Sequence, residues 1–191
     1  KPFSFDVAGR RKYADDGVTR LKDYVYTLIT IPNDRLLQLD SHNEQPKSWD
    51  DALRLADSVL QQGIQAIAEV VTVPGEINVD MADVKTTMEL PGQALMAIGE
   101  GSGPGGALEA ARQAVSNPLL DISIDGARGI LFNVSGGPSL TLGDVNDTGN
   151  FIAEKVDPNA LIFFGMGNRE ELGDKVKITV ISTGIPNKDG S

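Results

Sequence analysis

Three short polar residues, Asn78, Asp80 and Asp83, are grouped in one segment of the chain. The segment follows a Pro-Gly pair and leads into an expected helix over 80–88, so it is predicted to be a loop. Two carboxylates on such a loop can accept hydrogen bonds from a water molecule and orient it for attack. The same residues also fit a structural role, because Asp80 can cap the helix and Asp83 can favour its N-terminal dipole. The local pattern does not decide between these roles.

A glycine-rich segment over 99–106 is the second candidate site, because it precedes an expected helix over 107–116. Backbone N–H groups at a helix N-terminus can bind phosphate. This segment lacks the Gly-Lys-Ser/Thr ending of a P-loop, and Pro104 removes one donor, so a connecting loop is the better interpretation. The single histidine, His42, lies in a polar stretch and is interpreted as exposed.

Composition narrows the class of protein. The 191 residues include 17 Lys plus Arg and 27 Asp plus Glu, which gives a formal charge of −10. This charge argues against a nucleic-acid or anionic-membrane partner, since both bind cationic surfaces. Zero Cys and one His exclude disulfides, cysteine nucleophiles and His-rich metal sites, so no metal ligand is assigned. No apolar run is long enough for a membrane-spanning helix, and no membrane insertion is expected.

A long helix beginning at Ser48 is the main element expected to position these residues. Ser48 is a plausible N-cap, with Asp51 in place of the usual acid of a capping box, and Trp49 is expected to anchor this end. Apolar residues then recur at the 3.6-residue period until Pro74. Roughly 23 residues is long for a globular protein, so this helix is expected to connect two halves of the molecule.

Helices and strands alternate around this long helix, which indicates an α/β or α+β layer structure. Before it, the patterns predict a strand end at 3–5, a helix over 8–23, a doubly buried strand over 25–31, a short helix near 35–39 and a polar loop over 40–47. After it, they predict strands at 94–98, 129–134, 160–164 and 175–182, with helices over 80–88, 107–116 and 142–155.

Several stretches of the sequence resemble the prokaryotic tubulin homologue FtsZ. The resemblance begins with 1–5, 28–37 and 75–88, and continues through 116–120, 125–129 and 180–184. It follows the order of the family along almost the whole chain. The pattern Asn-x-Asp-x-x-Asp followed by Val-Lys is specific to that family, and it contains Asn78, Asp80 and Asp83.

The resemblance implies an α/β fold made of the tail of a Rossmann-like GTPase domain, a long central core helix and a C-terminal α+β domain with a mixed sheet. The family's nucleotide domain begins well before Lys1, and its glycine-rich phosphate loop is not in this sequence. The chain is therefore expected to be a piece of a longer protein. The implied divisions are the C-terminal part of the GTP-binding domain at 1–48, the core helix at 49–72, the synergy loop at 73–83, the FtsZ C-terminal domain at 84–185 and a tail at 186–191.

The implied function is that of a GTPase that polymerises head to tail into protofilaments for cell division. Asp80 and Asp83 would orient the attacking water on the GTP of a neighbouring subunit, and Asn78 would help to hold the loop near the nucleotide. Hydrolysis would need the complete, polymerised protein, and this chain alone is expected to be inactive.

The resemblance also implies nucleotide-binding residues in the first part of the chain. Asp6 and Arg10 match family positions that contact the ribose and phosphates, although Asp6 is shorter by one methylene than the usual Glu. Asn33 and Asp57 match positions beside the guanine base, and a carboxylate suits guanine because it can accept from both N1–H and N2–H₂.

The implied cofactors are GTP or GDP, shared with the missing half, and Mg²⁺. The implied partners are further copies of the protein, its own N-terminal half as a separate chain, and other division proteins. The expected location is the cytoplasm at the division site, with the plastid stroma as an alternative.

Two other functions stay open. A non-enzymatic fragment could dock on a homologue's nucleotide face and limit polymerisation. Without the resemblance, a small-molecule α/β enzyme remains, but no polar cluster beyond the loop at 73–83 supports it.

Overall fold

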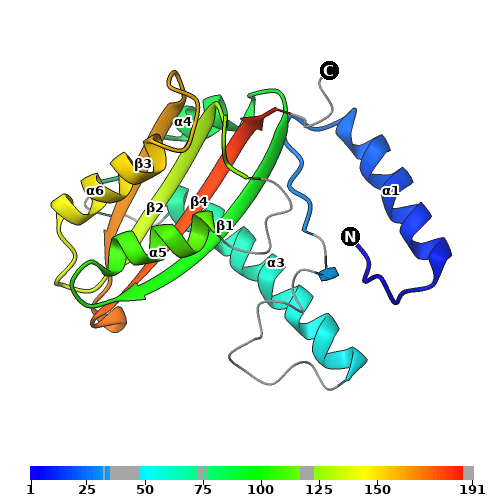
Figure 1. The fold of residues 1–191 in the computed structure, drawn as a ribbon, viewed down its shortest axis with the longest axis horizontal. Helices are drawn as coiled ribbons and strands as arrows, with labels where there is room; N and C mark the ends of the chain where they lie inside the picture. Colours follow the sequence, from blue (N-terminus) through cyan, green and yellow to red (C-terminus); the bar gives the residue numbers. More distant parts are fainter. Residues whose placement is uncertain (32, 35–47, 73–74, 76, 117–122, 187–191) are drawn as a thin grey trace.

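The computed structural model of the chain describes residues 1–31, 33–34, 48–72, 75, 77–116 and 123–186. In this part of the chain, a four-stranded sheet has helices on both faces, and one long helix extends beyond it (Figure 1). The expected α/β fold with a long helix and a mixed sheet is confirmed. The helices are α1 (Ala8–Lys22), α3 (Trp49–Thr72), α4 (Met81–Met88), α5 (Gly106–Val115), α6 (Leu142–Ala153) and the 3₁₀ turn η2 (Glu170–Leu172). The strands are β1 (Gln93–Ser102), β2 (Gly129–Gly136), β3 (Leu161–Asn168) and β4 (Lys175–Ile185).

The sheet combines parallel and antiparallel pairing. Its strand order is β1-β4-β2-β3, with β4 antiparallel to both β1 and β2 and with β2 parallel to β3. A parallel pair needs a crossover connection, and α6 provides it on the same face of the sheet as α5 (Figure 1). The inner strands β2 and β4 are buried along nearly their whole length. β3 is an edge strand.

Each face of the sheet has its own apolar core. On one face, Ile130 and Phe132 of β2 pack with the buried alanines of α5. On the other face, Leu131 of β2 and Ile181 of β4 pack with Val84 of α4. Neighbouring residues of β2 therefore belong to different cores, as the two-residue period of a strand requires.

β1 is longer than the sequence predicts, because it includes part of the segment 99–106 that we expected to be a connecting loop. Gly99 and Gly101 lie in β1 beneath α5, and a Cβ atom at Gly99 would overlap the carbonyl oxygen of Ala110. These glycines let the backbones of helix and strand approach closely. Only 103–105 form the turn into α5.

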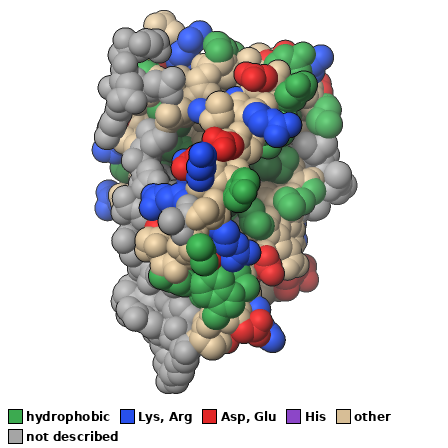
Figure 2. All heavy atoms as spheres, turned by 90° about the vertical axis from the view of Figure 1, so that its right-hand side faces the viewer, with side chains coloured by type: hydrophobic (Ala, Val, Ile, Leu, Met, Phe, Trp, Pro, Cys, Tyr) green, Lys and Arg blue, Asp and Glu red, His purple; other side chains and the backbone are tan. Residues whose placement is uncertain are grey.

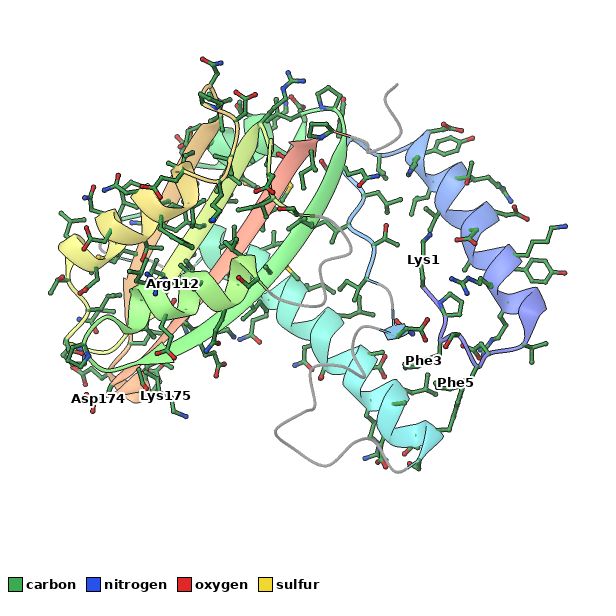
Figure 3. The ribbon with its side chains drawn as sticks, viewed as in Figure 1. Lys1, Phe3, Phe5, Arg112, Asp174 and Lys175 are labelled. Carbon is green, nitrogen blue, oxygen red and sulfur yellow. The ribbon has the colours of Figure 1, made fainter. Side chains whose placement is uncertain are left out.

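The long helix α3 begins as predicted. The hydroxyl of Ser48 accepts a hydrogen bond of 3.1 Å from the N–H of Asp51 and donates one of 2.7 Å to its carboxylate. Trp49 anchors this end of the helix, since its ring lies 6.0 Å from that of Phe3 and 5.3 Å from that of Phe5, between centroids. Figure 3 shows both phenylalanines beside the N-terminal half of α3.

The C-terminal half of α3 packs on the sheet instead. Gly63 lies against the thioether of Met96 in β1, and a Cβ atom at Gly63 would overlap its terminal methyl group. Ile67, one turn further, packs against the core that α4 shares with the sheet. α3 therefore joins the segment before it to the sheet after it.

The predicted strand end at 3–5 is wrong. The chain turns here, and the N–H of Asp6 donates a hydrogen bond of 3.1 Å to the carbonyl oxygen of Phe3. The N–H of Ser4 is also taken by a side chain, because it donates to the Asp34 carboxylate at 2.6 Å. With these local bonds made, residues 3–5 form a turn.

The predicted doubly buried strand over 25–31 is also not formed. A strand needs a partner along its edge, and this segment pairs with the sheet through one isolated parallel bridge between Ile29 and Ala94. The hydroxyl of Thr27 adds a hydrogen bond to the carbonyl oxygen of Met88. Tyr26 is 79% exposed, so the segment lies along the β1 edge without being buried.

The part of the molecule that carries α1 exposes many apolar side chains. Figure 2 shows hydrophobic groups among Lys, Arg, Asp and Glu on this face. The large hydrophobic residues exposed in this region are Phe5, Val7, Tyr13, Leu21, Tyr24, Val25 and Tyr26.

The predicted helix near 35–39, the polar loop over 40–47 with His42, and residues 187–191 lie outside the described residues. Among the described helices, none has both the length and the apolar character needed to cross a membrane.

Candidate functional site

The segment between α3 and α4 is held along the open edge of β3. Ile77 and Met166 exchange two backbone hydrogen bonds, of 3.3 and 2.9 Å. Gly75 lies against the same part of β3, and a Cβ atom there would overlap the carbonyl oxygen of Met166. Val79 is buried in the core with Leu131. Backbone bonds and apolar burial together fix the position of this loop.

Asn78 faces solvent, because it alternates with the inward-facing Ile77 and Val79. Its side chain closes the loop on itself: the N–H of Gly75 donates to Asn78 Oδ1 at 2.7 Å, and Asn78 Nδ2 donates to the carbonyl oxygen of Gly75 at 3.2 Å. Both polar ends of the amide are used within the loop. Asn78 therefore shapes the loop that carries the acids.

Asp80 is exposed and is the N-cap of α4. Its Oδ1 accepts a hydrogen bond of 3.0 Å from the N–H of Ala82, and its backbone carbonyl accepts from the N–H groups of Asp83 and Val84. The predicted capping role is thus confirmed. No hydrogen bond to Oδ2 is found within the described residues, so the cap leaves that oxygen available to solvent.

Asp83 lies in the first turn of α4 and is partly exposed. Its backbone carbonyl accepts a hydrogen bond of 2.9 Å from Thr87 Oγ1. No hydrogen bond or ion pair to its carboxylate is found within the described residues. Lys85 is the nearest basic residue on the helix, but its Nζ pairs with Glu89 Oε1 at 3.8 Å and not with Asp83. The Asp83 carboxylate can therefore accept hydrogen bonds from outside the chain.

Two carboxylates are too few to hold a metal ion by themselves. The described residues include no group of three or more His, Cys, Asp or Glu placed to bind a metal. The chemistry that Asp80 and Asp83 do fit is acceptance of hydrogen bonds from a water molecule, which needs an acceptor and a fixed position.

Asp6 and Arg10, the candidate ribose and phosphate residues, form an ion pair of 3.0 Å across one turn at the start of α1. The other oxygen of Asp6 accepts a hydrogen bond of 3.1 Å from the N–H of Phe3. The Arg10 side chain is mostly exposed, whereas that of Asp6 is nearly buried. Asp6 thus orients the guanidinium of Arg10, which can bind an anion as well.

Asn33 and Asp57, the candidate base-binding residues, lie on different elements. Asn33 is partly buried, and its N–H donates a hydrogen bond of 3.0 Å to the carbonyl oxygen of Lys1. Asp57 is exposed on the N-terminal half of α3. Within the part of the chain that the structure describes, no hydrogen bond or ion pair joins these two residues to each other. Their carboxylate and amide suit a purine base, but a set of phosphate-binding N–H groups is not gathered beside them in the described residues.

The two groups of candidate residues lie at opposite ends of α3. Phe3, which is bonded to Asp6, contacts Trp49 at the start of the helix. The loop with Asp80 and Asp83 follows its end. Between Asp57 and Thr72 alone, the helix rises about 22 Å. The acids therefore cannot reach a ligand held by Asp6 and Asp57 in the same molecule.

Comparison with known proteins identifies the family. The family model described as "FtsZ family, C-terminal domain" matches residues 92–186. These residues form an FtsZ C-terminal domain. Two solved structures of FtsZ from M. jannaschii, a mutant and a dimer described as empty, are each 37% identical to the chain and cover 96% of it, with TM-scores of 0.88 and 0.87. The chain spans about half the length of these relatives, 54% and 52%.

Two more distant structures share the fold alone. CetZ1 from Haloferax volcanii, described as a GDP-bound monomer, is 17% identical over 98% of the chain and 54% of its own length, with a TM-score of 0.72. TubZ from Bacillus thuringiensis serovar israelensis, described as a GTPγS-form protofilament, is 12% identical over 85% of the chain and 43% of its own length, with a TM-score of 0.66. The resemblance to FtsZ predicted from the sequence is confirmed.

Sequence reasoning located the acids of this FtsZ-like loop but missed the residues that hold it. Gly75 and Met166 bring two backbones together, and Gly165 in β3 also faces the loop, since a Cβ atom there would lie 3.3 Å from the carbonyl oxygen of Ile77. The signal was a pair of glycines, Gly165 and Gly167, inside an otherwise apolar strand, which often marks close approach of another backbone.

Proposed function

We propose that the chain is part of a cytoskeletal GTPase that polymerises head to tail into protofilaments for cell division. In this proposal, Asp80 and Asp83 complete the GTPase site of the neighbouring subunit. The FtsZ C-terminal domain at 92–186 supports the cytoskeletal role, and the structure of TubZ, which is described as a protofilament, shows that this fold can form filaments. The protein would act in the cytoplasm at the division site, as division proteins of this kind do.

The observation that carries the proposal is the separation of the two candidate groups along α3. Asp6, Arg10, Asn33 and Asp57 belong to the start of the helix, and the acids follow its end. Stacking one molecule on the next in the same orientation brings the end of one α3 to the start of another. Such a heterologous contact does not close on itself and so makes a filament.

At that contact, the residues of this chain have distinct roles. The carboxylate of Asp83, which has no partner in the described residues, accepts a hydrogen bond from water and orients it. Asp80 keeps one oxygen on the Ala82 N–H, which fixes its position, and presents the other oxygen to the same water. Asn78 holds the loop closed through Gly75 and acts as a positioning residue.

GTP with Mg²⁺ would supply the phosphoryl group and the charge that offsets the two carboxylates. Arg10, Asn33 and Asp57 would contribute contacts to the nucleotide, whose phosphate cradle would come from the nucleotide-binding half of the protein. Accordingly we divide the chain into the end of the GTP-binding domain (1–48), the core helix (49–72), the synergy loop (73–83), the C-terminal domain (84–185) and a tail (186–191). The N-terminal half, as the same or a separate chain, and other division proteins are the remaining partners.

The decisive experiment is Asp83→Asn in the complete protein. This change keeps the shape of the side chain and weakens the acceptor, so GTP turnover in polymers should fall by about 10²-fold or more. GTP binding and the melting temperature should stay close to those of the unchanged protein. Asp147→Asn, on the exposed face of α6, is the matched control and should leave turnover unchanged. Full turnover with Asp83→Asn would refute the proposed role.

A non-enzymatic capping function is the second candidate, because the described residues of the loop are held by contacts within this chain, between Ile77 and Met166 and between Asn78 and Gly75. The 191-residue chain should then shorten polymers of an FtsZ homologue in GTP when added below equimolar ratio. A chain carrying Gly75→Val, which would displace the loop from β3, should lose this effect. Unchanged polymer length with the original chain would exclude capping.

A further inference from the structure

Met81 carries the most exposed thioether of the molecule. The sequence has four methionines and no cysteine, and all four methionines lie in the described residues. Met81 is 62% exposed, whereas Met166 is 3% exposed. Met88 and Met96 are partly buried and pack against the core between α4 and the sheet. A peroxide in solution therefore reaches the sulfur of Met81 most easily.

Met81 also lies between the two acids of the loop. It is the first residue of α4, directly after the cap Asp80 and two residues before Asp83. Its exposed side chain is apolar, and it is surrounded in sequence by hydrogen-bond acceptors. Removing the apolar Met81 side chain from water is favourable, so it would stabilise a contact with another surface that covers it. If the loop docks on a neighbouring subunit, as proposed above, Met81 is buried by that contact.

We propose that Met81 is a redox-sensitive modification site that controls subunit docking. A lone pair of the Met81 sulfur attacks one oxygen of hydrogen peroxide, the S–O bond forms, the O–O bond breaks, and water leaves. Sulfur is oxidised by two electrons, and the peroxide is reduced by two. The product, methionine sulfoxide, is reversible by methionine sulfoxide reductases.

The sulfoxide is unfavourable at a docking surface for a local reason. Its oxygen is a hydrogen-bond acceptor, and the neighbouring side chains Asp80 and Asp83 are acceptors too. Ala82 and Val84 in the first turn of α4 are apolar and offer no donor. The ammonium group of Lys85, one turn further, lies 3.8 Å from the carboxylate of Glu89, with which it is paired. Burying an unpaired acceptor typically lowers an association constant by about tenfold. Oxidation should therefore weaken docking without disturbing the fold, since Met81 is outside both cores.

The inference rests on the proposed function, and its test separates the two. The complete protein is treated with hydrogen peroxide, the extent of oxidation at each methionine is measured by peptide mass spectrometry, and GTP-dependent sedimentation gives the critical concentration for assembly. Each protein is compared with its own untreated sample. We expect Met81 to be oxidised first, the critical concentration to rise about tenfold, and treatment with methionine sulfoxide reductases to reverse the rise. Assembly before treatment should protect Met81.

Two variants make the result specific. Met81→Leu removes the thioether at nearly constant volume and should make assembly insensitive to peroxide. Met88→Leu keeps Met81 and should stay sensitive. Unchanged assembly with Met81 fully oxidised, or equal loss in the Met81→Leu protein, would overturn the inference, as would earlier oxidation of Met88 or Met96. Each of these three results can occur while Asp83→Asn still lowers turnover, so failure here differs from failure of the proposed function.

Discussion

The sheet domain and the segment before α3 differ in how they are stabilised. The sheet of residues 92–186 has an apolar core on each face, one of them shared with α4, and Ile130, Phe132 and Ile178 are at most 1% exposed. The segment 1–31 has a single buried phenylalanine, Phe3, and is otherwise held by hydrogen bonds, two ion pairs and a ring cluster. The difference indicates that the sheet domain carries its own stability, whereas α1 depends on contacts that the described residues do not supply.

The largest effect is expected from truncation in the core of the sheet domain. Phe132→Ala removes a ring that is 1% exposed and lies 5.7 Å from that of Phe164, so it should lower the free energy of unfolding by about 3–5 kcal/mol. Tyr13→Ala in α1, at a site 81% exposed, should change it by less than about 0.5 kcal/mol. Urea unfolding followed by far-UV circular dichroism gives both values. Similar losses of unfolding free energy from Phe132→Ala and Tyr13→Ala would contradict the difference in stability between the sheet domain and α1.

The same substitution should have opposite signs in the two regions. Gly99→Ala forces a methyl group into the Ala110 carbonyl oxygen beneath α5 and should destabilise the sheet domain by about 1–3 kcal/mol. Gly17→Ala, in α1, meets no atom within 4 Å and should stabilise the helix by up to about 1 kcal/mol. Helical content and urea midpoints measure the two effects. A gain of stability with Gly99→Ala would mean that α5 does not lie on β1 as described.

The smallest expected effect concerns helix capping. Thr141 and Asp144 form a capping box at the start of α6, with hydrogen bonds of 3.2 Å to Thr141 Oγ1 and 2.9 Å to Asp144 Oδ2. Thr141→Ala should cost about 1 kcal/mol. α1 has no side-chain cap, so Val7→Ser at its N-cap position should instead increase helicity. Thermal unfolding and circular dichroism test the pair. An unchanged melting temperature with Thr141→Ala would show that α6 is fixed by packing alone.

The sequence predicted best where helix periodicity and capping residues agree. The long helix capped by Ser48 and the short helix capped by Asp80 both follow from local patterns that the structure repeats. The helix expected over 142–155 also forms, and its Thr141 cap is visible only in the structure. It failed at 25–31, because a β-branched run predicts that a strand is possible but not which edge it pairs with. The sequence also placed Gly99 and Gly101 in a loop, although they lie in β1. A glycine that allows a helix to pack closely on a strand cannot be told from a loop glycine by the sequence alone.

The candidate site divides in the same way. The exposure of Asp80 and the cap it forms could be predicted from residue types and spacing. The attachment of the loop to β3 could not, because it depends on backbone bonds between Ile77 and Met166, which lie far apart in the chain and leave no side-chain signature.

The attachment of the loop to β3 has a mechanical consequence. Because Ile77 is bonded to the sheet edge and Val79 is buried in the core shared by α4 and the sheet, the two acids are fixed to the sheet domain. Any rotation of the sheet domain relative to the start of α3 would therefore move both carboxylates together. The orientation of the sheet domain would thus set the distance between the two carboxylates and the surface of a neighbouring subunit.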